Sequence, residues 1–367
     1  METYFVFGTY FAICIMYMYT NTEILANNNL RLKKIVVTHL GVLIFLLGAL
    51  RNQNTGSDTH NYCLRFINQS GSLLDIFNEA IKYVDSEKAY YILAAIFRYF
   101  TDNPQVWLAV SCLVFIIPCA ILIYKHSDNP AISYIYIVAL LIYQFTWQGL
   151  RQEYAMATCL IATMFLIKKK WVWFVILFIL AFMFHRTAVV FLLVLIAFRF
   201  KPNVWGFLLV VGFFFLSYIS PFSVNLIIAR IFGDTDFAGT DKVLGYAASV
   251  RSGSSYKLFA VLFVFYIISY ACKDGLIKRN PLNGFFINMS LIGCCFQALA
   301  VGIPEFFRLA YYFSIFNMLL VPNVCEYLQE RNNRLPIRLI TVAMLIAVYF
   351  LTGGFKYWFM WEQGPWM

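Results

Sequence analysis

The sequence predicts an all-α integral membrane protein whose helices cross the bilayer many times. Of its 367 residues, 62% are hydrophobic and only 13% are charged, and the mean hydropathy is +0.72. A soluble domain carries roughly 25% charged residues, so this composition lies outside the soluble range. The first apolar run, residues 4–19, has no basic leading segment and no small-residue cleavage site, so no cleavable signal peptide is expected.

The formal net charge of +10 does not indicate a nucleic-acid partner. Most Lys and Arg residues stand in short connectors between apolar runs, where they orient a membrane protein and face anionic lipid. The nine cysteines lie mainly inside apolar runs and have no metal-ligand spacing with His. They are predicted to be small buried hydrophobic residues. Neither a metal site nor a cofactor is expected.

Basic connectors set the predicted topology because positively charged loops stay cytoplasmic. They occur at residues 31–34, 125–126, 168–170, 199–201, 273–279 and 331–338. A crossing takes about 20 apolar residues, so the intervening sequence gives about 12 crossings and places both termini outside. The crossings lie near residues 3–20, 35–50, 104–124, 131–148, 153–167, 171–184, 187–199, 204–220, 256–272, 283–301, 306–322 and 338–354. The whole chain, 1–367, is predicted to be a single transmembrane domain.

Two longer external loops are predicted, near 51–103 and 221–255. Within the first, residues 71–101 have the pattern of an amphipathic surface helix. Its apolar positions are Leu73, Phe77, Ala80, Ile81 and Val84, with Asp75, Glu79 and Lys82 opposite. The apolar stretch 89–97 is too short to cross, and a crossing there would turn Lys168–Lys170 outward. We therefore expect this segment to be interfacial or re-entrant.

Four arginines fall at the outer ends of predicted helices: Arg51, Arg151, Arg186 and Arg308. A guanidinium is a planar fork that matches phosphate oxygens, whereas an ammonium is a hydrated point charge. A single such arginine usually extends to lipid headgroups, and Glu153 or Glu305 could simply neutralise the arginine near it. The presence of four on one face, with His185 beside one of them, favours a shared site for an anionic ligand.

Two further external side chains are candidates for chemistry. His185 is next to Arg186, which favours the neutral imidazole that a general base needs, although a lone histidine is more often a buried structural residue. Asp58 lies in the polar stretch 54–62 that follows Arg51. Both an Arg51–Asp58 pair lining a site and a solvated loop fit this pattern.

Three ordered stretches carry a family resemblance. The first is Arg51 with Gly56, Asp58 and Tyr62; the second is residues 151–157 followed by 184–188; the third is residues 308–313 leading to Pro322. In this order and spacing, the chain resembles the EpsG family of bacterial exopolysaccharide proteins, within the wider group of Wzy-type O-antigen and capsule polymerases. The resemblance covers roughly residues 40–325 and leaves out the tail 355–367.

The resemblance implies an enzyme of the bacterial inner membrane with its active face toward the periplasm and a GT-C-like, O-antigen-ligase-like architecture. Donor and acceptor would both be oligosaccharides on undecaprenyl pyrophosphate, and the growing chain would pass to a hydroxyl of the next repeat unit. No metal or cofactor is implied. The partners would be these lipid-linked substrates, the bilayer and a chain-length regulator, with no nucleic acid.

The expected roles combine this resemblance with the chemistry of glycosyl transfer. Guanidinium groups stabilise a departing pyrophosphate, and a neutral imidazole accepts the proton of an attacking hydroxyl. Arg51, Arg151, Arg186 and Arg308 are therefore the predicted pyrophosphate ligands, with Arg51 and Asp58 toward the acceptor. His185 and Asp58 are the predicted catalytic residues. Gln152, Glu153, Tyr62, Glu305 and Tyr311 are predicted to support them.

Two other functions remain open at this point. A flippase for lipid-linked oligosaccharides would also bind pyrophosphate, but it needs charged groups at mid-membrane along a two-sided path. The clearest charges here gather at one face, which disfavours it. A membrane acyltransferase that modifies a polysaccharide would use a buried histidine and an acyl donor from the cytoplasm.

Overall fold

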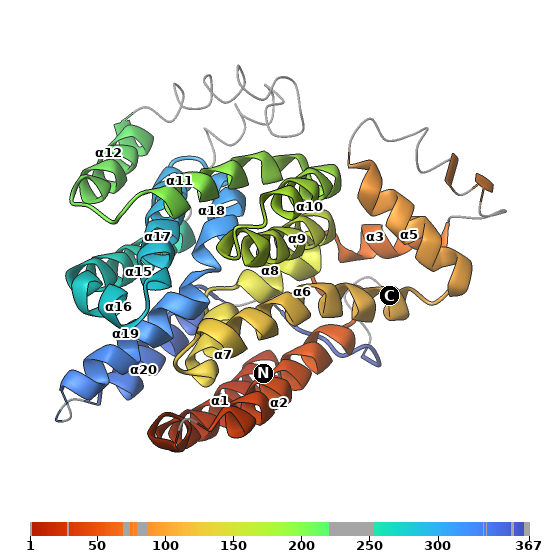
Figure 1. Ribbon diagram of the computed structural model, residues 1–367. Helices are drawn as coiled ribbons and strands as arrows, with labels where there is room; N and C mark the ends of the chain where they lie inside the picture. Colours follow the sequence, from red (N-terminus) through yellow and green to blue (C-terminus); the bar gives the residue numbers. More distant parts are fainter. Residues whose placement is uncertain are drawn as a thin grey trace. The chain divides into compact units, whose positions relative to one another are not determined.

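The computed structural model describes residues 2–27, 29–68, 74–75, 77–78, 87–219, 253–332, 334, 336–353 and 356–362. Nearly all of these residues are helical and none lies in a β-strand (Figure 1). Contacts divide the chain into two compact units, Met1–Val190 with Gly353–Met367, and Phe191–Thr352. Each unit is described by itself here. The single transmembrane domain stays a prediction.

Three helices of the first unit begin at strong start signals. Asn29, Asn103 and Asn129 each accept a backbone N–H at a helix start, and Pro104 and Pro130 take the first helical positions. α9 and α10 run side by side (Figure 1). The elements are α1 (Glu2–Asn27), α2 (Leu30–Ala49), α3 (Thr59–Ile67), α5 (Lys88–Phe100), α6 (Pro104–His126), α7 (Pro130–Ala139), α8 (Ile142–Gln148), α9 (Leu150–Ile167), α10 (Trp171–Phe184) and the start of the 3₁₀ helix η1 (Arg186–Leu193).

The second unit surrounds α17, which packs against α12, α15 and α18. Its helices are α11 (Val194–Arg199), α12 (Trp205–Ile219), α15 (Gly253–Ala271), α16 (Lys273–Arg279), α17 (Leu282–Leu299), α18 (Phe306–Ser314), α19 (Asn317–Arg331) and α20 (Ile337–Leu351). Asn283 and Asn323 join α17 to α19, because the amide of Asn323 donates to the side-chain oxygen of Asn283 at 2.9 Å. Such a pair satisfies polar atoms inside an apolar bundle.

The helices agree with a polytopic membrane protein. Among the described residues, three helices are long and apolar enough to cross a bilayer, and two bent helix pairs raise this number to five if each pair is one span. Four shorter apolar helices accompany them. Each of the ranges predicted to cross contains a helix or consecutive helices. The number of about 12 crossings and the GT-C-like architecture stay predictions.

The two predicted external loops are described only in part. Leu73, Ala80, Ile81 and Val84, four of the five apolar positions in the predicted surface helix, lie outside the described residues, as do residues 220–252. The described part of the first loop contains α3 and α5. On α5, Tyr90 and Ala94 are buried while Tyr99 and Phe100 are exposed, so this helix is amphipathic.

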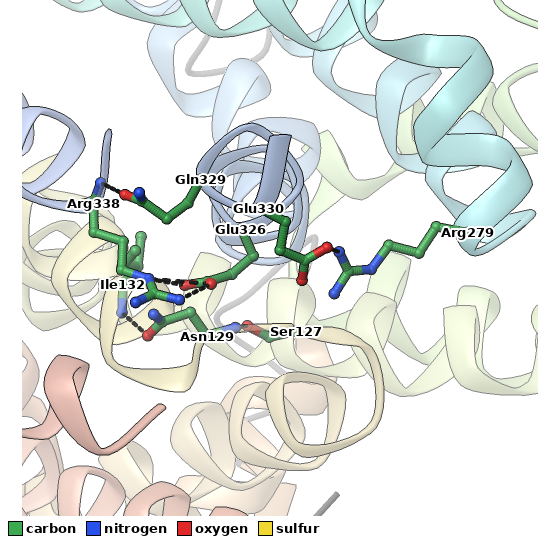
Figure 2. Close-up of polar contacts among 8 residues, drawn as sticks. All are labelled: Ser127, Asn129, Ile132, Arg279, Glu326, Gln329, Glu330 and Arg338. Atoms are coloured by element: carbon green, nitrogen blue, oxygen red, sulfur yellow. Dashed lines mark hydrogen bonds and ion pairs between the residues drawn. The ribbon is translucent and has the colours of Figure 1, made fainter. Parts of the chain in front are cut away.

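An ion pair joins the last two helices of the second unit (Figure 2). Arg338, at the start of α20, donates from Nε to both carboxylate oxygens of Glu326 in α19, at 2.9 and 3.1 Å, and from Nη2 to one of them. Glu326 is fully buried, whereas one turn further along α19 the more exposed Glu330 pairs with Arg279 at 2.8 Å. Figure 2 also shows Asn129 of the first unit accepting the backbone N–H of Ile132 at the start of α7.

These two glutamates give a matched stability test. We expect Glu326→Gln to destabilise the protein by about 3 kcal/mol, because it leaves a mostly buried arginine without its counter-charge. Glu330→Gln should cost less than about 1 kcal/mol, since an exposed pair is screened by water. Thermal unfolding midpoints of the purified variants in detergent measure both. Equal midpoints for the two variants would contradict the assignment of Glu326 as the stabilising partner.

Candidate active site

A cluster of charged side chains in the first unit is centred on Glu87. One carboxylate oxygen of Glu87 is in direct contact with Nδ1 of His185, and the other with Nη1 of Arg151. The backbone N–H of Arg186 also donates to the first oxygen, at 3.4 Å. The hydroxyl of Tyr62 accepts a hydrogen bond from Nε of Arg151 at 3.2 Å. The structure thus gathers four residues predicted from the sequence around a fifth that was not predicted.

Helix ends hold this cluster in place. Glu87 precedes α5, Arg151 lies in the first turn of α9 after the break at Gly149, and His185 follows the last residue of α10 in an extended conformation. Backbone groups at a helix end lack partners within the helix, so they can bond to side chains from neighbouring helix ends. This is why residues far apart in the sequence converge at one point.

A row of aromatic rings supports the same helix ends. Tyr62 of α3 packs edge-on against Tyr90 of α5 with centroids 5.6 Å apart, and Tyr90 packs against Tyr154 of α9 at 5.8 Å. Tyr154 contacts Phe184, the residue before His185, at 5.4 Å. Edge-to-face aromatic pairs stabilise by about 0.5–1.5 kcal/mol beyond the area they bury. These ring contacts therefore hold the ends of α3, α5, α9 and α10 together next to the charged cluster.

The backbone of Glu87 is itself unusual. Its φ of 64° and ψ of 30° lie in the left-handed region, which costs a residue with a Cβ roughly 1–2 kcal/mol. Its side chain forms no capping bond to α5 and is buried, at 8% exposure. A residue persists in such a conformation only where its surroundings compensate, and here the contacts to His185 and Arg151 do so.

Glu87 is the counter-charge of the cluster. Burial raises the pKa of its carboxyl, but the hydrogen bond and charge of His185, the charge of Arg151 and the N–H of Arg186 outweigh burial and lower the pKa below the ordinary glutamate value. The ionised form therefore stabilises the fold above the unfolded pKa of about 4.3. This contribution is lost as the pH falls through the lower folded pKa.

The net charge of the cluster around Glu87 is positive. Arg151 and Arg186 carry two positive charges against the single negative charge of Glu87, and the guanidinium of Arg186 is exposed. Arg151 is 31% exposed. An incompletely neutralised pair of guanidinium groups suits an anion with several oxygens. Among the described residues, no group of three His, Cys, Asp or Glu side chains is placed to hold a metal ion.

A loop that ends at Asp58 leads into α3, which carries Tyr62 of this cluster. Gly56 has a φ of 99°, which favours glycine, and the hydroxyl of Ser57 donates to the side-chain oxygen of Gln148 at 3.0 Å. Asp58 is exposed at the start of α3 and forms no side-chain capping bond. No Arg51–Asp58 pair forms, so of the two interpretations left open the solvated loop is the one the structure favours.

Arg51 lies in the interior of the first unit. Its guanidinium is fully buried, donates to the backbone oxygen of Gly48 and to Sγ of Cys112 at 3.0 Å, and stands over the ring of Trp147. The chain end covers it: Arg51 forms a backbone bridge with Phe359. This position does not favour the predicted role of Arg51 as a pyrophosphate ligand on the acceptor side, because a fully enclosed group cannot reach a substrate.

Gln152 and Glu153 are buried in α9. The sequence left open that Glu153 neutralises Arg151, and this interpretation is wrong, since Arg151 pairs with Glu87 instead. Residues two positions apart point to different sides of a helix. The carboxylate of Glu153 interacts electrostatically with the buried charge of Arg51.

Arg308, Glu305 and Tyr311 belong to the second unit. Nε of Arg308 lies 3.2 Å from a carboxylate oxygen of Glu305, so the neutralising pair left open by the sequence is formed. Tyr311 is buried in α18. The predicted roles of these three residues at a pyrophosphate site stay predictions.

Glu87 was not predicted from the sequence. It stands 64 residues from Arg151 and 98 from His185, in a stretch without a motif. One general expectation could have pointed to it: cationic or basic residues that share a site require a counter-charge, and Glu87 is one of the acidic residues in the predicted external loop 51–103.

Comparison with known proteins completes the description of the site. No curated protein and no solved structure matches the chain. A family model matches residues 34–359, which includes part of the tail that the sequence analysis left outside the resemblance. This match contains Glu87, Arg151, His185 and Arg308 and covers nearly the whole chain, so the protein belongs to the EpsG family.

Proposed function

We propose that this protein is a glycosyltransferase that polymerises repeat units carried on undecaprenyl pyrophosphate at the outer face of the bacterial inner membrane. Membership of the EpsG family indicates a membrane protein of polysaccharide biosynthesis. The observation that carries the finer proposal is the contact of one buried carboxylate with both a histidine and an arginine in the first unit. Glycosyl transfer from a pyrophosphate needs a base and an anion-binding group held at a fixed spacing.

The reaction joins two lipid-linked oligosaccharides. A hydroxyl of the acceptor repeat unit attacks the anomeric carbon of the donor chain, and its proton passes to Nε2 of His185 as the new C–O bond forms. The bond between the anomeric carbon and the pyrophosphate oxygen breaks, and that oxygen keeps the electron pair. The product is a chain longer by one repeat unit on the acceptor's carrier, with undecaprenyl pyrophosphate released.

The arginines act on the leaving group in this proposal. Negative charge grows on the pyrophosphate as the glycosidic bond breaks, and preorganised guanidinium groups stabilise that charge. Arg151 is fixed by two contacts, to Glu87 and Tyr62, and Arg186 is exposed and bonds to Glu87 through its backbone N–H. The Tyr62 hydroxyl accepts from Arg151, so its own proton is available to a phosphate oxygen. Burial raises the pKa of Tyr62, which keeps that proton in place.

A deletion strain tests the function. We expect it to display surface polysaccharide of one repeat unit instead of long chains, and to accumulate carrier-linked single repeats in the outer leaflet. Complementation with the wild-type gene should restore the ladder of chain lengths. Accumulation of the same lipids in the inner leaflet would indicate a flippase. Unchanged chain lengths with loss of an acyl substituent would indicate an acyltransferase, and either result overturns the proposal.

A further inference from the structure

We propose that Glu87 is a positioning residue that presents Nε2 of His185 and one edge of the Arg151 guanidinium to the same substrate. This inference rests on the proposed function, because it assigns Glu87 a part in that reaction. Nothing in the sequence motifs points to Glu87, whereas the structure places it between the two groups that act on substrate. Each of its two carboxylate oxygens is used by a different partner.

The first contact fixes the histidine ring. An ionised carboxylate only accepts hydrogen bonds, so Nδ1 of His185 must carry the proton that it shares with Glu87. In the neutral ring the lone pair then lies on Nε2. Among the residues that the structure describes, Nε2 has no hydrogen-bond partner, and the side chain is 15% exposed. Glu87 therefore selects the tautomer and the ring orientation in which Nε2 can accept a proton from a sugar hydroxyl.

The second contact fixes the arginine. Glu87 occupies Nη1 of Arg151 and Tyr62 occupies Nε, which leaves Nη2 without a partner among the described residues. A guanidinium held by two contacts loses little conformational freedom when it binds phosphate. Because one carboxylate bridges both side chains, the spacing between base and phosphate ligand is set by a single group. Misplacement by about 1 Å can cost on the order of 100-fold in rate.

Glu87 does not fit the role of the base itself. Both its oxygens are engaged and it is 8% exposed, so neither lone pair is available to an incoming hydroxyl. A purely structural role is the remaining alternative. A Glu87→Gly variant distinguishes the positioning role from the structural role. At a φ of 64° glycine relieves the backbone strain, and the substitution also removes the carboxylate. A structural role predicts that Glu87→Gly harms folding, and a positioning role predicts that it harms catalysis.

The experiment compares Glu87→Gln and Glu87→Gly with the wild type and with Glu330→Gln, a control that breaks an ion pair of α19. Purified proteins are assayed for polymerisation of lipid-linked repeat units between pH 5 and 9. We expect both Glu87 variants to lose about 10- to 100-fold in kcat, the usual effect of removing a group that orients a ligand. The control should keep the wild-type rate and pH profile.

The pH profile is the readout that a structural role would not move. Among the residues that the structure describes, the charged or titratable groups linked to His185 by hydrogen bonds and ion pairs are Glu87, Arg151, Arg186 and, through Arg151, Tyr62. Glu87→Gln removes the negative charge that contacts the proposed base, so the pH profile of this variant should differ from that of the wild type. A rate loss with an unchanged profile, or loss of folded protein in Glu87→Gly, would overturn the positioning role.

A second readout does not depend on polymerase activity. Nitrogen NMR of protein labelled at histidine distinguishes a protonated Nδ1 from a protonated Nε2, and the His185 signal is assigned by its loss in His185→Gln. We expect Nδ1 to be protonated in the wild type, with the tautomers redistributed in Glu87→Gly. An unchanged tautomer would overturn the inference. A wild-type protein that shows the Nδ1 proton but no polymerisation would instead overturn the proposed function.

Discussion

Lysine in place of Arg151 is expected to abolish most polymerisation while leaving the amount of protein unchanged. Arg151 uses Nη1 for Glu87 and Nε for Tyr62, and its remaining edge is the proposed phosphate ligand. A single ammonium keeps the charge but cannot serve three partners in a fixed plane. Loss of one preorganised donor costs about 2.7–4 kcal/mol of barrier, or roughly 100- to 1,000-fold in rate. Polymer length distributions from complemented strains measure the effect.

Arg279→Lys is the matched control, because Arg279 also pairs with a glutamate but does so in an exposed ion pair of the second unit. It should give the wild-type ladder.

Arg308→Lys separates two interpretations of that residue: a loss like that of Arg151→Lys would support its predicted role on pyrophosphate, and a normal ladder would leave it as the partner of Glu305. A normal ladder from Arg151→Lys would contradict the phosphate-ligand assignment, since a headgroup contact needs only positive charge.

Alanine in place of His185 is expected to lower kcat by about 100- to 10,000-fold, the range for loss of a general base. Binding of lipid-linked repeat units should stay close to that of the wild type, because the base acts in the chemical step and the Arg151–Tyr62 contact does not involve the imidazole. Binding of a labelled repeat unit and single-turnover transfer, measured on the same purified protein, separate the two effects.

His60→Ala is the control for the base. His60 is the other histidine that the sequence predicts to be external, and it is exposed on α3. Its replacement should leave the rate unchanged. If His60→Ala abolished transfer and His185→Ala did not, the base would be assigned to the wrong residue. Weakened binding in His185→Ala with an unchanged rate of transfer would make His185 a ligand of the substrate.

The class of protein and the approximate positions of its apolar helices followed from local properties of the sequence. Apolar runs near the length of a crossing, broken by polar and basic connectors, placed the ranges in which helices now lie, including the short pair α7 and α8. The three ordered stretches, at Arg51, at Arg151 with His185, and at Arg308, together identified the family, which the family match confirms. Such signals are local because helix formation and membrane insertion depend on consecutive residues.

Which polar residues meet was decided only by the tertiary structure. Arg51 and Arg151 look alike in the sequence, since each begins a motif at a helix end, yet one is enclosed over Trp147 and the other faces Glu87. Glu87 itself carries no motif. Its partners are 64 and 98 residues away, and a contact over such a separation depends on how helices pack, not on the composition of either segment. The sequence by itself therefore predicted arginine and histidine residues at the helix ends of a membrane protein. The packing of α3, α5, α9 and α10 decided that one buried carboxylate contacts both Arg151 and His185.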